Sequence, residues 1–361
     1  MDRRPQFKDP ALAKALLTKI GMLAKDLPEV RIMEVCGTHT MEIGRLGLRQ
    51  RLPDNIRLLS GPGCPVCVTP GEVIDSAVSY AQMPNHVLAT FGDMIRVPGS
   101  GQSLEQVKAN GAAIAIVASP LQLIKMAEER PETTIVFAAV GFETTIPAVA
   151  RTIEIAAEKK LPNLKMLVAH RLLPPALSAL CGDADTHISG FLLPGHVSAI
   201  IGEEVYRTID ELNVPGAITG FEALDILGGI LSVLEMLINQ TALIINMYPR
   251  VVRPEGNPHA RALIHKFFTP IDAAWRGIGI IPQSGLALRD EFKAFDAPVL
   301  TQGSSTLPKG CSCGKVLKGL ITPSGCSLFG SACTPQTPIG PCMVSSEGSC
   351  AAYYRYERIN R

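Results

Sequence analysis

The stretch VRIMEVC, residues 30–36, decides how the rest of the chain is interpreted. Apolar residues fall on both faces of the strand that this segment would form, which is typical of a parallel sheet covered by helices on both sides. The strand ends at Cys36, because the polar residues GTHT (37–40) follow it. Ligands of open α/β sheets bind beyond the carboxyl ends of the strands, so Cys36 is the first candidate for a functional residue.

The same plan repeats up to residue 248, where apolar runs are separated by amphipathic, helix-like segments. Further strands are expected at 56–60, 86–91, 112–119, 133–140, 164–169, 188–193 and 242–248. This alternation predicts an α/β fold with mostly parallel sheets, and the length of the chain favours two lobes of this kind. We expect the first α/β lobe at residues 29–110 and the second at residues 111–240.

Residues 241–361 are expected to form a third, cysteine-rich domain that packs with residues 1–28. The segment TPSGCSLFGSACTPQTPIGPCMVSSEGSC (322–350) consists mostly of Gly, Pro, Ser, Thr and Cys. So few large apolar side chains cannot form a core, and a bound group must supply the order instead. Six of the ten cysteines of the chain lie in this third domain.

The composition excludes several classes of protein. With a formal net charge of +1 over 361 residues, the chain lacks the electrostatic footprint of a protein that binds nucleic acid. Its most apolar long segment, residues 224–240, is interrupted by Asp225 and Glu235, so a membrane span is not expected. The N-terminal residues do not resemble a signal peptide, so we expect a cytoplasmic protein. In that compartment ten cysteines serve metal, cluster or redox chemistry instead of a disulfide framework.

Residue types that ligate metals or transfer protons follow most of the predicted strands. At these positions stand Cys36, Cys64 and Cys67 in GPGCPVC (61–67), Asp93, Glu143, His170 and His196. A single residue of this kind is usually a structural polar group. Their concentration at the ends of strands favours a shared site at one edge of the sheets.

The GPGCPVC loop supplies two thiols near Cys36. Pro65 disfavours helical geometry at Cys64, so this thiol is expected in an extended segment. Two chemistries fit the three cysteines. They could hold a soft metal such as iron, copper or zinc with an open coordination position, or form a dithiol–disulfide couple with a third, exchanging thiol. The residues alone leave both chemistries open.

Four cysteines of the third domain are spaced C-x6-C-x8-C-x7-C, at Cys326, Cys333, Cys342 and Cys350. This spacing lacks the paired knuckles of zinc fingers and favours a [4Fe–4S] cluster, with zinc as the alternative. Cys311 and Cys313 leave the choice of ligands open, since any four of the six cysteines fit. Cys181 lies on a predicted helix and is interpreted as a small core residue.

Several motifs resemble the HypD family of [NiFe]-hydrogenase maturation proteins. They are EVCGTHT, GPGCPVC, TFGDM, GFETT, PGH and a tail that contains GPCMVSSEG and AAYY, within residues 30–355. The resemblance implies two similar α/β lobes around a cleft, with Cys36, Cys64 and Cys67 as the cleft thiols and candidate metal ligands. It also implies a domain that carries a [4Fe–4S] cluster on Cys326, Cys333, Cys342 and Cys350.

In that family, the protein and the small chaperone HypC form a scaffold on which iron acquires one carbonyl and two cyanide ligands. The cyanide comes from HypE with HypF, and the Fe(CN)2CO unit then passes to the hydrogenase large subunit. The resemblance therefore implies a scaffold or accessory protein with thiol–disulfide redox ability. Cys36 would ligate iron together with a HypC cysteine, while Cys64 and Cys67 would cycle between dithiol and disulfide.

Further residues are candidates for moving protons or for bonding to bound ligands. They are His39, Asp93, Glu143, His196 and Glu347. His39 ranks first because it shares a loop with Cys36. Two rival hypotheses stand beside the scaffold. One is an iron–sulfur-dependent disulfide reductase that acts through Cys64 and Cys67, and the other is an adaptor that holds a structural cluster.

Overall fold

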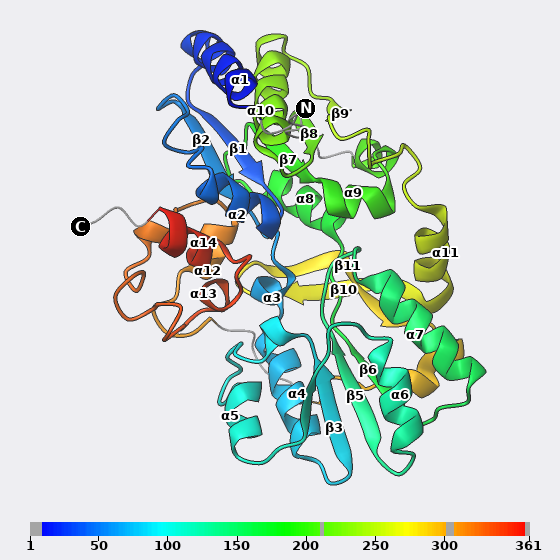
Figure 1. Ribbon diagram of the computed structural model, residues 1–361. Helices are drawn as coiled ribbons and strands as arrows, with labels where there is room; N and C mark the ends of the chain where they lie inside the picture. Colours follow the sequence, from blue (N-terminus) through cyan, green and yellow to red (C-terminus); the bar gives the residue numbers. More distant parts are fainter. Residues whose placement is uncertain (1–8, 210–212, 301–306, 358–361) are drawn as a thin grey trace, which may run out of the picture.

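The computed structural model describes residues 9–209, 213–300 and 307–357. Its framework consists of two parallel sheets, one above the other in Figure 1. Sheet A has the strand order β2-β1-β7-β8-β9, and sheet B has the order β4-β3-β5-β6. The fold is therefore α/β with mostly parallel sheets, as the alternation of apolar runs and helix-like segments predicted.

Sheet A consists of β1 (Val30–Glu34), β2 (Ile56–Ser60), β7 (Gly190–Pro194), β8 (Gly216–Thr219) and β9 (Ile244–Asn246). Sheet B consists of β3 (His86–Thr90), β4 (Ile114–Ile116), β5 (Thr134–Ala139) and β6 (Leu164–Val168). An antiparallel hairpin of β10 (Phe268–Trp275) and β11 (Gly279–Leu288) lies between the two lobes in Figure 1. The central strands β5 and β7 are buried almost throughout, as expected of parallel strands with helices on both faces.

Helices cover the sheets and connect them. The sheet A lobe contains α1 (Pro10–Leu23), α2 (Gly37–Arg45), α9 (Gly195–Ile201) and α10 (Ala223–Ile238). The sheet B lobe contains α4 (Gly71–Gln82), α5 (Leu104–Ala109), α6 (Gln122–Glu129) and α7 (Ile146–Glu158), with α11 (Pro258–Phe267) packed on α7. The chain passes between the lobes at α3 (Pro65–Val68) and α8 (Leu173–Gly182), and the cysteine-rich part contains α12 (Cys313–Leu317), α13 (Pro341–Val344) and α14 (Ser349–Tyr356). Within the described ranges, no helix combines the length and the apolar character that crossing a membrane requires.

The chain enters sheet B and then returns to sheet A, so the sheet A lobe is not one continuous segment. β1 and β2 belong to sheet A, β3 to β6 to sheet B, and β7 to β9 to sheet A again. β7 pairs with β1, with Gly190 opposite Ile32. The boundary expected at residue 110 instead falls inside sheet B, between β3 and β4, so the lobes do not coincide with residues 29–110 and 111–240. Buried parallel strands look alike in sequence, and composition therefore does not mark the return.

Residues 241–361 also divide among different parts of the fold. β9 completes sheet A, the hairpin bridges the lobes, and residues 307–357 form a cysteine-rich region beside sheet A. α1 packs against α10, so the helical part of residues 1–28 does not join the cysteine-rich region as expected. Ile20 of α1 is buried in the same core as Ile230 of α10, which accounts for this position. Residues 1–8 lie outside the described part of the chain.

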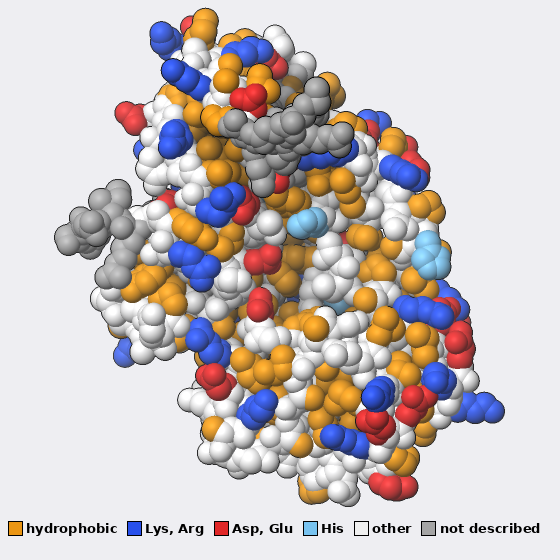
Figure 2. Space-filling view, viewed as in Figure 1, with side chains coloured by type: hydrophobic (Ala, Val, Ile, Leu, Met, Phe, Trp, Pro, Cys, Tyr) orange, Lys and Arg blue, Asp and Glu red, His pale blue; other side chains and the backbone are white. Residues whose placement is uncertain are grey.

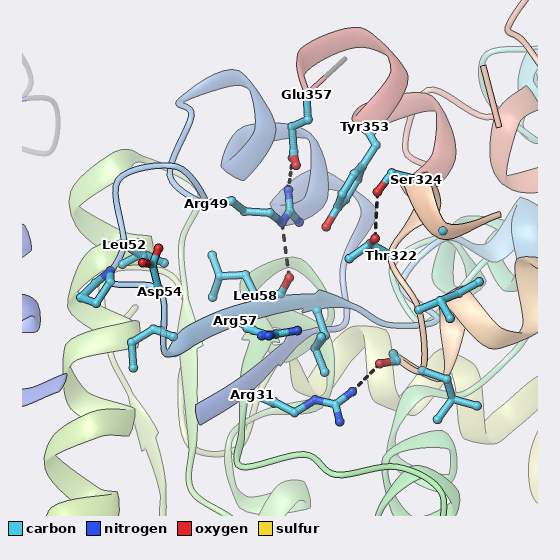
Figure 3. Close-up of a pocket in the computed structure, with 17 residues that line it drawn as sticks. Arg31, Arg49, Leu52, Asp54, Arg57, Leu58, Thr322, Ser324, Tyr353 and Glu357 are labelled. Atoms are coloured by element: carbon cyan, nitrogen blue, oxygen red, sulfur yellow. Dashed lines mark hydrogen bonds and ion pairs between the residues drawn. The ribbon is translucent and has the colours of Figure 1, made fainter. Parts of the chain in front are cut away.

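Two arginines fix the cysteine-rich region to the edge of sheet A (Figure 3). Arg31 on β1 donates a hydrogen bond to the carbonyl oxygen of Gly319 at 2.7 Å. Arg49 forms an ion pair with Glu357 and lies over the ring of Tyr353, 4.5 Å from the ring centroid. A pocket of about 550 Å³ lies between these contacts. Beside this pocket α14 packs against α2, the helix that follows the first candidate cysteine.

Candidate thiol and metal centre

Cys36 and the GPGCPVC loop lie side by side where β1 and β2 end. The two strands pair in parallel with Glu34 opposite Ser60, so their carboxyl ends share one edge of sheet A. The Gly37 N–H donates to the carbonyl oxygen of Gly63 at 3.0 Å. A Cβ atom on Gly63 would stand 2.2 Å from the backbone nitrogen of Cys36. Only glycine at position 63 therefore lets the loop approach Cys36 this closely.

Cys64 and Cys67 form a disulfide across the short helix α3. Cys64 is the extended residue before the helix and Pro65 is the first helical residue, as the proline predicted. The cysteines are 3% and 1% exposed, so solvent hardly reaches either sulfur. A protein thiol could exchange with this pair only after a local rearrangement.

The surroundings of Cys36 keep its thiol protonated. Burial, with smaller contributions from Glu347 and Glu34, raises the pKa of Cys36 to about 12, although backbone N–H groups of His39 and Thr38 lower it. Both N–H groups belong to the first turn of α2, where the backbone donors have no partner within the helix. The thiol is therefore neutral near pH 7, and a bound cation would favour the thiolate.

Acidic side chains from other parts of the fold approach Cys36. Thr38 donates its hydroxyl hydrogen to Glu347 of the cysteine-rich region at 3.0 Å. Burial raises the pKa of Glu347, and Asp93 from the end of β3 in the sheet B lobe adds to this effect. Figure 2 shows acidic and histidine side chains in the middle of the visible face, between the two lobes. Asp93 is exposed and Glu347 is half-buried, so a bound ligand or a partner protein can reach Asp93 directly.

Glu143 and Tyr206 form a second polar group near Cys36. Glu143 is 2% exposed, and its Oε1 accepts a hydrogen bond from the Leu173 N–H at 2.8 Å. Its Oε2 has no hydrogen-bond partner among the described residues, and burial raises the pKa of Glu143 to about 7. Burial also raises the pKa of Tyr206, and the nearby Glu143 and Cys36 add to this rise. A carboxyl group that is half protonated near pH 7 is suited to giving or taking a proton.

The two candidate histidines lie on either side of one aromatic ring. His39 lies in the first turn of α2, directly after Cys36, but its Nε2 lies 2.9 Å from the carbonyl oxygen of Gly220. Burial lowers the pKa of His39 to about 4, so this ring is neutral. The exposed His196 stacks on Phe221 at 4.0 Å, and the same ring lies 4.7 Å from His39. His39 therefore acts on Cys36 through its backbone N–H, while its side chain bonds to the end of β8.

Five of the six cysteines of the cysteine-rich region line one small pocket, and the sixth, Cys342, interacts with Cys313. Cys311, Cys313, Cys326, Cys333 and Cys350 line this pocket together with Leu328, Phe329 and Met343. The Sγ atoms of Cys311 and Cys313 are 3.2 Å apart. Hydrogen bonds with Cys311, Cys342 and Cys350 lower the pKa of Cys313. Cys311 and Cys313 thus join the four cysteines that the spacing singled out.

This group of sulfur donors is compatible with an iron–sulfur cluster. Cysteines from separated turns around one largely apolar pocket are the surroundings in which proteins hold such clusters. A Cβ atom on Gly340 would stand 2.6 Å from the Cys311 Sγ and 2.7 Å from the Cys313 Sγ, so only glycine lets the backbone lie against these sulfurs. Among the residues that the structure describes, no three His, Cys, Asp or Glu side chains are grouped around a single metal-ion position, so the compatibility with a cluster rests on the cysteines that share this pocket.

Known proteins are similar in sequence to this chain over most of its length. The HypD family model, described as the hydrogenase formation hypA family, matches residues 11–357. A putative hydrogenase expression/formation protein of Methanocaldococcus jannaschii is 39% identical over 357 residues, which cover 98% of this chain and 99% of the relative. The hydrogenase maturation factor HypD of Escherichia coli K12 is 42% identical over 335 residues, which cover 91% of this chain and 90% of the relative. The chain belongs to the HypD family.

Membership of the HypD family makes this chain a hydrogenase maturation factor, as the motifs predicted. The HypD factor of Azotobacter vinelandii is likewise similar, at 40% identity over 364 residues, with 98% of this chain and 96% of the relative covered. All the quoted motifs lie within the matched residues.

The sequence analysis did not identify Tyr206 as a polar residue of the centre, and it selected other residues only because they follow predicted strands. Tyr206 lies in a 3-10 helix, Glu204–Thr208, away from any predicted strand end, and no motif marks it. His170 follows β6 as expected, but it is fully buried and its ring lies 6.1 Å from that of Phe268 in the hairpin. Cys181 lies in α8 and packs against the main hydrophobic core, as its interpretation as a core residue requires.

Proposed function

We propose that this HypD-family chain is a redox-active iron–sulfur scaffold on which, together with HypC, the Fe(CN)2CO unit of [NiFe]-hydrogenase is assembled. The observation that carries the proposal is the direct contact between Cys36 and the Cys64–Cys67 loop. Carboxylates from the cysteine-rich region and from the sheet B lobe stand beside this contact. Such a meeting point supplies soft ligands, proton carriers and a redox pair to one small substrate.

The iron substrate would be held by the Cys36 thiolate and by a cysteine of HypC. Metal binding requires loss of the Cys36 proton, because only the thiolate is a good ligand. Glu347 of the cysteine-rich region, whose charge acts on Cys36, is the candidate proton acceptor, and Asp93 of the sheet B lobe acts in turn on Glu347. The N–H groups at the start of α2 already favour the charged form of Cys36, and iron would complete that shift.

Cys64 and Cys67 would switch between disulfide and dithiol. Reduction adds two electrons and two protons, which converts the S–S bond into two thiols. A bound [4Fe–4S] cluster on Cys326, Cys333, Cys342 and Cys350 would supply one-electron transfer chemistry. α13, which carries Cys342, packs against α3, which carries Cys67, so the two groups of sulfurs stand on contacting helices. Glu143, whose pKa is raised to about 7, is suited to provide a proton.

The same thiol centre would interact with several partner proteins. HypC would supply the second iron ligand, HypE would deliver cyanide made with HypF, and the hydrogenase large subunit would receive the finished unit. The exposed Asp93 and His196 are the candidate residues for contacts with these partners or with the bound cyanide and carbonyl.

A disulfide reductase is the second candidate, because Cys64 and Cys67 are joined in this structure. The low exposure of both cysteines favours the scaffold, since a substrate disulfide has no open path to either sulfur. The redox pair would then serve bound iron or HypC instead of a general protein substrate.

Hydrogenase maturation in a host whose own HypD gene is deleted tests the proposal. We expect Cys36→Ala, Cys64→Ser and Cys67→Ser each to abolish hydrogenase activity at unchanged protein level, whereas Cys181→Ala in α8 restores the wild-type level. Full maturation by Cys64→Ser and Cys67→Ser would remove the redox step from this account. Full maturation by Cys36→Ala would refute the proposed scaffold function.

A further inference from the structure

Arg276 carries a positive charge deep inside the molecule. The residue follows β10 and is 1% exposed. Its backbone N–H donates to the carbonyl oxygen of Val68 at 2.8 Å, and its Nη1 donates to the carbonyl oxygen of Pro98 at 3.0 Å. Its Nε is buried without a hydrogen-bond acceptor in the described part of the chain. The guanidinium is therefore only partly satisfied by the protein's neutral groups.

No carboxylate compensates this charge directly. Within residues 9–209, 213–300 and 307–357, no Asp or Glu oxygen lies within ion-pair distance of Arg276. The carboxylate of Asp75, which acts on Arg276 from further away, already accepts hydrogen bonds from the N–H and the hydroxyl of Ser100 at 2.8 and 2.7 Å. An unpaired charge in such a position costs several kcal/mol or more, so an anionic partner is needed.

The cysteine centre can supply the anionic partner that Arg276 lacks. Burial lowers the pKa of Arg276, and Cys313, Cys311 and Cys342 are the main groups that raise it again. The backbone shows the same proximity: a Cβ atom on Gly277 would stand 2.9 Å from the Cα of Gly314. The residues that follow Arg276 and Cys313 are thus in direct contact.

We propose that Arg276 is the buried counter-charge of the cysteine centre and that it favours the reduced state of the bound cluster. The proposal rests on the proposed iron–sulfur function. Each added electron makes the cluster more negative, so a fixed cation nearby stabilises the reduced form more than the oxidised form. Through the Val68 carbonyl oxygen, the backbone of Arg276 also holds the residue next to Cys67. Arg276 is in this sense a positioning residue between the cluster and the Cys64–Cys67 pair.

An EPR-monitored redox titration of the anaerobically reconstituted full chain, with dithionite as reductant, tests this role. Arg276→Gln keeps the backbone hydrogen bond and removes the charge. At a fixed potential we expect its ratio of reduced to oxidised cluster to fall about tenfold, which corresponds to about 59 mV for one electron. Arg276→Lys keeps the charge and should remain closer to wild type than Arg276→Gln.

Arg96→Gln is the matched control. Arg96 also touches the cysteine-rich region, where it donates to the carbonyl oxygen of Pro335 at 3.1 Å, but it forms no hydrogen bond to a cysteine of the described ranges. Its loss should leave the midpoint potential unchanged. A midpoint potential of Arg276→Gln equal to that of wild type, at equal iron and sulfide content, would overturn the proposal.

Iron and sulfide analysis separates this inference from the function on which it rests. If wild-type protein takes up no cluster, the proposed iron–sulfur function fails first. If Arg276→Gln alone fails to hold the cluster while Arg276→Lys holds it, the requirement for a positive charge is supported. If both variants lose the cluster, shape and not charge is required, and the counter-charge role is refuted.

Discussion

At the scale of single residues, Glu143 should make the stability of the protein depend on pH. Its pKa is about 7 in the folded protein against 4.5 as its ordinary value, so the folded state binds the proton more tightly. The stabilisation is fully present below pH 4.5 and is lost as the pH rises through 7. When the pH is raised from 5 to 8, the titration of Glu143 should lower the free energy of unfolding by about 2–3 kcal/mol.

Glu143→Gln should abolish this part of the pH dependence, since the amide stays neutral. Urea unfolding at pH 5 and pH 8 measures it, with the variant relatively more stable at the higher pH. Glu34, whose pKa is also raised to about 7 by burial, retains its own share of the dependence in both proteins. Parallel pH profiles of wild type and Glu143→Gln would show that Glu143 titrates normally.

Gly63 is a second residue whose substitution has a definite expected effect. A Cβ atom there would collide with the backbone of Cys36, so Gly63→Ala must push the GPGCPVC loop away from β1. We expect a loss of about 2–4 kcal/mol in the free energy of unfolding, together with loss of hydrogenase maturation. Gly101→Ala is the control, because apart from its chain neighbours no atom of the described residues lies within 4 Å of its added methyl group. Equal stability of the two variants would refute the close contact at Cys36.

At the scale of elements, strands formed by continuous apolar runs could be predicted from the sequence, whereas short or partly exposed strands could not. All the strands expected between residues 30 and 248 are present; most are shorter than expected, β2 has the expected bounds, and β7 begins and ends later than expected. β8 was missed because it has only four residues, Gly216–Thr219, directly after a proline. The hairpin was missed because β10 contains Pro270 and Asp272 and leaves several side chains exposed, so the segment resembles a loop. Short or half-exposed strands depend on their neighbours more than on their own sequence.

Substitution of Arg49 tests how the cysteine-rich region is attached to the sheet A lobe. It is largely buried and pairs with Glu357, and its guanidinium lies 3.7 Å from the fully buried Glu34. Arg49→Met would leave these carboxylates without their cation, at an expected cost of about 3 kcal/mol in urea unfolding. Arg45→Met removes a more exposed pair with Glu42 and should change stability by less than about 0.5 kcal/mol. Equal losses in the two variants would contradict a docking role for Arg49.

At the scale of the whole molecule, the meeting of the thiols was predictable and the path of the chain was not. The strand-end rule found Cys36 and the GPGCPVC loop because adjacent parallel strands end at one edge. The pairing of β7 with β1 depends on tertiary packing, which the sequence of the strand alone does not reveal. Arg276 was missed for a similar reason, since its proposed role depends on the cysteines that act on its charge and not on any motif.

The central claim is that Cys36 holds the iron substrate beside the Cys64–Cys67 pair. Infrared spectroscopy of the complex of this chain with HypC, purified anaerobically, tests it most directly. We expect cyanide and carbonyl stretching bands in the wild-type complex and in Cys181→Ala, and no such bands in Cys36→Ala, with the HypC complex itself still formed. Bands of normal position and intensity in the Cys36→Ala complex would contradict the claim.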